Sequence, residues 1–291
     1  MHEPSDTLVI GAGVSGLASA LCLLERGRSV RVVDAGRVGG GSSHGNCGTL
    51  TPSHAGPLHA PGMIARALRW MLTPDAPFYV RPRVDPALWR WMLHFAGRCN
   101  LRDWNASARP RAAILNASRE AFPRWIADHG LDCEFAEPGT DCVFRNAAEL
   151  EACVRQLPAL AELGIASEVI DGAAYLAQEP ALREGVAGAV RYPGDAQLRP
   201  DKYVAGLARA VVAAGGVIEE HCEVRQVEAG AGGMRVATSG GERRATWCWR
   251  PAPGRRCWHS RCACAGCAAR CSRARAIRSP GRDRRWCRSG R

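Results

Sequence analysis

A glycine-rich turn near the N-terminus constrains the fold of this chain more than any other feature. The turn reads Gly-Ala-Gly-Val-Ser-Gly over residues 11–16, between a short apolar run at 7–10 and an amphipathic stretch at 14–26. In this arrangement the first glycine makes the tight turn, the second lets a pyrophosphate approach the backbone, and the third lets the helix pack closely on the strand. Asp34 ends the next apolar run, 23 positions after Gly11. The pattern predicts a strand–helix–strand unit that binds a dinucleotide.

Six residues of this unit are candidate cofactor ligands. The amides at the start of the helix and its positive dipole end suit phosphate groups, and the Asp34 carboxylate is placed to accept hydrogen bonds from ribose hydroxyls. The candidates are Gly11, Gly13, Val14, Ser15, Gly16 and Asp34. A second glycine-rich loop, residues 39–43, follows almost at once, which is unusual for a nicotinamide enzyme. FAD is therefore the favoured cofactor, and an NAD-dependent dehydrogenase is the alternative.

The rest of the chain predicts an α/β (α+β) architecture in which a second region interrupts the nucleotide-binding domain. Residues 55–105 are rich in Trp, Pro and Arg, and helical spacing follows at 112–129 and 147–163. Strand character returns at 187–192, before a helix at 201–214 and three further strands at 217–220, 223–228 and 234–238. We expect four segments: a Rossmann-like FAD-binding unit at 5–55, a substrate or cap region at 56–185, a return to the FAD-binding domain at 186–242, and a tail at 243–291.

Composition limits where the protein acts. No run of about 18 apolar residues occurs, so no segment is expected to cross a membrane. The N-terminal residues read as a strand and not as a cleaved leader. The seven cysteines before residue 243 are scattered in apolar contexts, as in a reduced cytosolic protein. We expect a protein of the cytoplasm, or of the inner face of the plasma membrane, without a metal site.

Positive charge is concentrated at one end of the chain. The 291 residues carry a net charge of +11, but residues 243–291 hold 15 Arg and one acid, Asp283, a net charge of +14. Residues 1–242 therefore carry a net charge of −3. A basic surface over the whole protein would indicate a nucleic-acid partner. Because the body of the chain is mildly acidic, we expect no nucleic-acid partner for it.

Several segments beyond the glycine turn carry a resemblance to a known family. Residues 41–52 read Gly-Ser-Ser-His-Gly-Asn-Cys-Gly-Thr-Leu-Thr-Pro, residues 69–71 read Arg-Trp-Met, and residues 194–197 read Gly-Asp-Ala-Gln. The sequence resembles the FAD-dependent glycine/D-amino-acid oxidase superfamily, and within it the small subunit of bacterial D-amino-acid dehydrogenases. The resemblance extends over about residues 5–240.

The resemblance implies an enzyme that oxidises the C–N bond of a D-amino acid or cyclic imino acid. Hydride would pass from Cα to the flavin of a non-covalently bound FAD, and the imine would hydrolyse to a 2-oxo acid. The implied partners are a small-molecule amine and an electron acceptor, quinone or oxygen. No catalytic residue is assigned, because many arginines could bind the substrate carboxylate.

The same resemblance extends the set of candidate FAD ligands. It implies that the pyrophosphate and the flavin are lined by Ser42, Ser43, Asn46 and Gly48. Val224 would hold the adenine through its main chain, although the residues alone equally predict a buried strand residue there.

The tail from Arg243 onward lacks apolar periodicity and admits three interpretations. Cys264 and Cys267 have the spacing of half a zinc site, but no second pair lies at the required distance. The arginines could bind nucleic acid, although cysteine and proline are unusual companions. The favoured interpretation is translation in the wrong frame, because the codons of residues 247–250, read one nucleotide earlier, encode Leu, Met or Val followed by Val-Leu-Ala, as the family requires.

This interpretation has structural consequences. We expect residues 243–291 to be disordered and a sheet strand beside the first strand to be missing, so that the chain as written is an inactive, truncated product.

Overall fold

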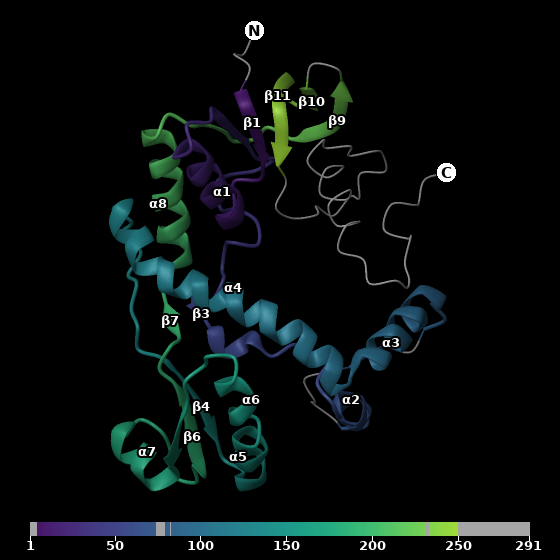
Figure 1. Ribbon diagram of the computed structural model, residues 1–291, viewed down its shortest axis with the longest axis vertical. Coiled ribbons are helices and arrows are strands. Elements are labelled where there is room, and N and C mark those ends of the chain that lie inside the picture. The colour runs from purple at the N-terminus through teal and green to yellow at the C-terminus, as the bar shows by residue number, and fades with distance from the viewer. Residues whose placement is uncertain (1–4, 74–78, 82, 231–232, 250–291) are drawn as a thin grey trace. The chain divides into compact units, whose positions relative to one another are not determined.

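The computed structural model describes residues 5–73, 79–81, 83–230 and 233–249, which fall into two compact units (Figure 1). The first unit takes in the chain up to Cys47, the short segment His129–Cys133 and the chain from Arg199 onward. The second unit takes in Gly48–Asp128 and Glu134–Leu198.

The first unit is built on one six-stranded sheet and two helices. Its elements are β1 (Ser5–Ile10), α1 (Val14–Leu24), β2 (Val30–Val33), α8 (Pro200–Ala213), β8 (Val217–Glu219), β9 (Val224–Gly230), β10 (Gly233–Thr238) and β11 (Gly241–Trp249). The strand order is β8-β2-β1-β11-β10-β9, with β8, β2, β1 and β11 parallel and β10 antiparallel to both its neighbours. Leu8, Val9, Val32 and Val33 are almost fully buried, as is typical of parallel strands covered on both faces.

The second unit is built around a small antiparallel sheet and a long helix. Its elements are β3 (Thr49–Leu50), the 3₁₀ turn η1 (Pro52–Ala55), α2 (Met63–Met71), α3 (Pro86–Arg98), α4 (Leu101–Asp128), β4 (Thr140–Phe144), α5 (Ala147–Val154), α6 (Leu157–Ala161), β5 (Glu168–Asp171), α7 (Gly172–Gln178), β6 (Gly188–Tyr192) and β7 (Ala196–Gln197). β4, β6 and β5 pair in that order, and β3 pairs with β7. The largest core cluster joins Ala55, Ala112, Leu160, Ile165, Val190 and Tyr192.

The local predictions for the first unit are confirmed. The glycine turn lies between β1 and α1, and β2 follows as the third element of the strand–helix–strand unit. The helix expected at 201–214 is α8, and the strands expected after it are β8, β9 and β10. Their parallel and antiparallel pairing gives the mixed α/β architecture that the sequence predicts.

The predicted domain boundaries need correction. The return to the FAD-binding domain was expected at residue 186, but β6 pairs with β4 and β5 of the second unit, so the return comes at Arg199. The first boundary, expected at residue 55, lies at Cys47, because β3 pairs with β7 in the second unit. A short apolar strand has the same pattern in either sheet, and only its pairing partner identifies the unit to which it belongs.

The prediction that the chain is disordered from Arg243 onward is wrong for residues 243–249, which form most of β11. A two-residue connection leads from Thr238 to Gly241, whose φ of 102° is readily adopted by glycine. The first half of β11 then pairs with β10 up to Ala245, and the second half pairs with β1 from Ala245 to Trp249. The strand beside β1 is therefore present, and residues 250–291 lie outside the described residues.

Candidate functional site

The glycine turn between β1 and α1 is held in a single conformation by backbone contacts. Gly11 has a φ of 109°, a value that side-chain-bearing residues rarely adopt. A Cβ on Gly16 would overlap the carbonyl oxygen of Gly11, whereas a Cβ on Gly13 would lie 3.2 Å from Oγ of Ser43. The first and third glycines are thus required by the fold, and the second leaves the face of the turn open.

The N-terminus of α1 offers free hydrogen-bond donors. Gly13 is the N-cap in an extended conformation and has no side chain that could accept from the helix. The amide of Val14 donates to Oγ of Ser43 over 3.1 Å. Within the described part of the chain, the amides of Gly13, Ser15 and Gly16 have no acceptor. Unpaired amides at the positive end of a helix dipole fit an anionic group such as a pyrophosphate.

Asp34 lies beside this turn and holds it in place. Its Oδ2 accepts a hydrogen bond from the amide of Ala12 over 2.7 Å, and its Oδ1 accepts one from the amide of Gly36 over 2.8 Å. The carboxylate thus fastens the glycine turn to the end of β2, a role that the sequence reasoning missed. The Asp-x-Gly order of residues 34–36 is a signal for the second contact, because aspartate often accepts from an amide two residues ahead. Each carboxylate oxygen retains a lone pair for a ribose hydroxyl.

The second glycine-rich loop contributes one side chain to the turn. Ser43 is half-buried and accepts from the amide of Val14, while Ser42 and Asn46 are exposed on the same loop. Gly48 belongs to the second unit, where it is buried and its carbonyl accepts from the amide of Leu198 over 2.9 Å. The described contacts therefore bring Ser43 to the first glycine motif.

Val224 begins β9 and is partly buried against the core cluster of the first unit, which contains Leu8, Val33, Cys222, Met234, Val236 and Ala245. It pairs with Thr238 across a register shift between β9 and β10. Both readings made from the sequence, a packed strand residue and a main-chain contact for adenine, are compatible with this position.

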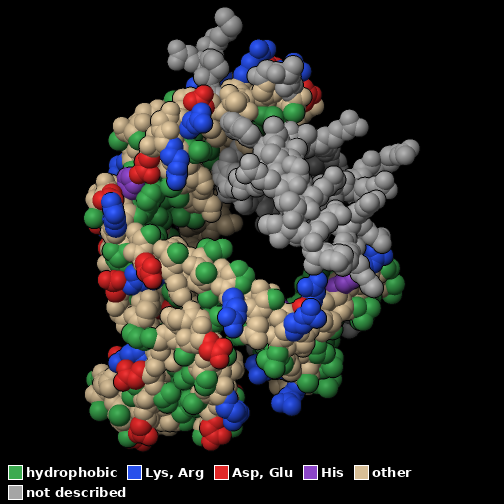
Figure 2. All heavy atoms as spheres, viewed as in Figure 1, with side chains coloured by type: hydrophobic (Ala, Val, Ile, Leu, Met, Phe, Trp, Pro, Cys, Tyr) green, Lys and Arg blue, Asp and Glu red, His purple; other side chains and the backbone are tan. Residues whose placement is uncertain are grey.

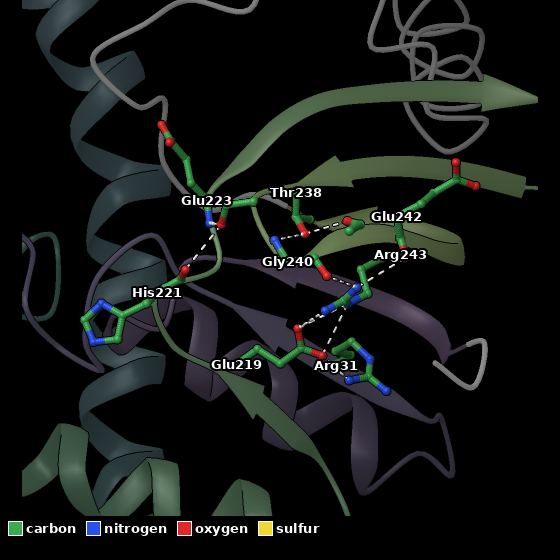
Figure 3. Close-up of polar contacts among 10 residues, drawn as sticks. Arg31, Glu219, His221, Glu223, Thr238, Gly240, Glu242 and Arg243 are labelled. Carbon is green, nitrogen blue, oxygen red and sulfur yellow. Dashed lines mark hydrogen bonds and ion pairs between the residues drawn. The ribbon is translucent and has the colours of Figure 1, made fainter. Parts of the chain in front are cut away.

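The sequence reasoning also missed an ion-pair cluster that joins three strands of the first unit (Figure 3). Glu219 at the end of β8 accepts from Nη2 of Arg243 over 2.7 Å and from Nε over 3.1 Å, and it also pairs with Arg31 of β2. The Arg243 side chain is only 6% exposed. Burial raises the pKa of Glu219, but the hydrogen bonds and charges of the two arginines outweigh it and leave the pKa below its usual value. Arg243, expected to lie in a disordered tail, is an integral part of the sheet.

Within the described residues, no group of three or more His, Cys, Asp or Glu side chains is arranged to hold a metal ion. The candidate zinc ligands Cys264 and Cys267 lie outside those residues.

Comparison with known proteins identifies the family. The model of the DAO family, described as FAD dependent oxidoreductase, matches residues 6–257. D-amino acid dehydrogenase of Granulibacter bethesdensis is 35% identical over 196 residues, which are 65% of this chain and 46% of that protein. The Vibrio cholerae D-amino acid dehydrogenase is 34% identical over 194 residues, with the same two coverages. The chain thus spans about half the length of these relatives.

A solved structure shows the same fold. Glycine oxidase from Geobacillus kaustophilus superposes with a TM-score of 0.65 at 20% identity, covering 86% of this chain and 56% of that one. The match of the family model over most of the sequence agrees with the fold and with the free amides of the glycine turn. This chain belongs to the DAO family of FAD-dependent oxidoreductases.

Proposed function

We propose that this chain derives from an enzyme that oxidises the C–N bond of a D-amino acid or cyclic imino acid with FAD. The observation that carries the proposal is the N-terminus of α1. The amides of Gly13, Ser15 and Gly16 have no acceptor among the described residues, and Asp34 lies beside them, as suits the ADP half of FAD. The relatives at 32–35% identity are named D-amino acid dehydrogenase, which supports the substrate class.

The proposed cofactor ligands divide by chemical role. The residues of the glycine turn would hold the pyrophosphate through their amides, and Asp34 would accept from the ribose. Ser42, Ser43, Asn46 and Gly48 would line the pyrophosphate and the flavin, and the main chain of Val224 would meet the adenine. Bound FAD supplies the two-electron oxidation, accepting hydride from the substrate Cα. The imine from a D-amino acid would hydrolyse to a 2-oxo acid and ammonia, whereas the cyclic imine from a cyclic imino acid would open to an amino-2-oxo acid without releasing ammonia.

We also propose that the codons after about residue 245 are read out of frame. In the alternative frame the segment beside β1 would read Leu, Met or Val followed by Val-Leu-Ala, which suits a strand between two others better than alternating Trp and Cys. Sequencing the coding DNA across codons 240–250 tests this reading directly, and an unbroken frame in the genome would contradict it.

The catalytic proposal is tested on the frame-restored protein. D-Alanine or D-proline, added without oxygen, should bleach the absorbance of bound flavin, whereas the L-forms should not. Reoxidation of the bleached protein by a quinone or by oxygen identifies the electron acceptor. A flavin that remains oxidised with every D-substrate would contradict the substrate class, and a preparation that instead reduces NAD would favour the alternative dehydrogenase.

The place of action is also a proposal. We place the protein in the cytoplasm or at the inner face of the plasma membrane, where a quinone acceptor would be within reach. None of the helices in the described ranges is both long and apolar enough to cross a bilayer.

A further inference from the structure

Two helices of the second unit, α2 and α3, contribute nothing to a hydrophobic core. Neither helix contains a buried residue. Between Leu58 and Ser107 no described residue is buried. Yet the segment is rich in large apolar side chains, and those exposed within it are Leu58, Leu68, Leu72, Tyr79, Val84, Trp89, Trp91, Leu93 and Leu101. A folded protein rarely leaves so much apolar surface together without a partner.

The outward sides of both helices are apolar. On α3, Leu88 and Met92 are half-covered, but Trp89 and Leu93, one turn apart, are 52% and 74% exposed. At the end of α2, Leu68 and the C-cap residue Leu72 are also one turn apart, and Leu72 is 86% exposed. Each helix therefore presents an apolar stripe to its surroundings.

Arginines flank these stripes. Residues 63–102 contain seven Arg and two Asp, a net charge of +5, whereas the rest of residues 1–242 sums to −8. Arg66, Arg69 and Arg90 are exposed and form no ion pair with a described residue. Figure 2 shows hydrophobic and basic side chains gathered over α2 and α3. We call the side chains of Leu68, Arg69, Leu72, Trp89, Arg90 and Leu93 the α2–α3 face.

We infer that the α2–α3 face docks on an anionic lipid surface. Helices that lie in a membrane interface combine Trp and Leu on the buried side with Arg that reaches the phosphate groups. The positive charge of this segment, within residues 1–242 that are otherwise acidic, complements the negative surface of a bilayer and not a neutral partner. This face is the surface through which the protein would contact the plasma membrane. The inference rests on the proposed function only for that location, because docking on lipid needs no flavin chemistry.

Co-sedimentation of the frame-restored protein with vesicles tests the inference, because the arginines of residues 243–291 in the chain as written would themselves attract anionic lipid. Binding should be strong with phosphatidylcholine vesicles that contain phosphatidylglycerol, weak with phosphatidylcholine alone, and should fall as salt rises. Each arginine removed in Arg69→Gln/Arg90→Gln should lower partitioning about fivefold, the equivalent of about 1 kcal/mol. Trp89→Ser/Leu93→Ser should lower it at least as much, because two inserting side chains are lost.

Matched controls lie elsewhere on the chain. Arg124→Gln/Arg155→Gln removes two arginines that are 87% and 68% exposed on α4 and α5, and Val169→Ser/Val212→Ser removes two exposed apolar side chains. Both controls should bind vesicles as the wild type does. Equal binding to neutral and anionic vesicles would overturn the inference, and so would unchanged binding by both face variants. If the wild type does not bind vesicles, and Trp89→Ser/Leu93→Ser converts a dimer to a monomer, the face would instead belong to an interface with a second copy of the chain. Flavin content plays no part in these outcomes, so a failed enzyme assay leaves them intact.

Discussion

Gly13 and Gly16 differ in what surrounds them, and this separates binding from folding. In the frame-restored protein, Gly13→Val should lose bound FAD but keep its fold, because the new Cβ meets only Oγ of Ser43 at 3.2 Å while its methyl groups shield the free amides. Gly16→Ala should instead destabilise the protein by about 1–3 kcal/mol, since its Cβ overlaps backbone. Flavin absorbance per protein and urea unfolding measure the two effects, with Ser15→Ala as the control. Stoichiometric flavin in Gly13→Val would show that the assignment of the turn is wrong.

Glu219 gives the first unit a pH dependence. Its pKa is lowered in the folded protein, so its stabilising effect is complete above the unfolded-state pKa and is lost as the pH falls through the folded-state pKa. Glu219→Gln should therefore cost about 1–3 kcal/mol at neutral pH and nothing in acid. Denaturant unfolding across this pH range is the measurement. Glu228→Gln, which breaks the exposed pair with Arg235, is the matched control and should cost about 0–1 kcal/mol. Equal costs for the two variants would contradict a structural role for the buried cluster.

At the scale of elements, β11 is held by two different neighbours. Its first half forms a hairpin with β10, and its second half lies beside β1 in parallel. We expect hydrogen exchange to show protected amides on both sides of Ala245 in the chain as written. Thr246→Pro should remove that protection and lower the folded fraction, because proline cannot donate within a sheet, whereas Thr246→Val keeps the amide and should not. Fast exchange after Ala245 in the wild type would show that the second half of β11 does not form in solution.

At the scale of the molecule, the sheet of the first unit can form in a chain that lacks enzymatic activity. The chain spans about half the length of its relatives, so the chain as written should keep the sheet of the first unit but show no flavin reduction by D-substrates. The frame-restored protein should show it, and its FAD affinity should be higher. Titration of both forms with FAD, followed by anaerobic addition of D-alanine, makes the comparison. Substrate-dependent reduction in the chain as written would contradict the proposed frameshift as a cause of inactivity.

The sequence by itself determined the parts of this protein that depend on neighbouring residues. The elements β1, α1 and β2 could be predicted from the spacing between Gly11 and Gly16 and from the apolar and amphipathic runs around it. Turn geometry and helix periodicity are local properties, so a short window of sequence contains them. The same locality allowed α8 and β8–β10 to be located.

Only the tertiary structure decided what depends on distant partners. β6 looks like any short apolar strand until β4 and β5 assign it to the second unit. Arg243 looks like one arginine of a basic tail until Glu219, 24 residues away, pairs with it in the sheet. The helical pattern at 63–71 and 86–98 does not reveal that both helices lack a core to pack on. Pairing across the sheet and burial are set by the whole chain, and no window of sequence contains them.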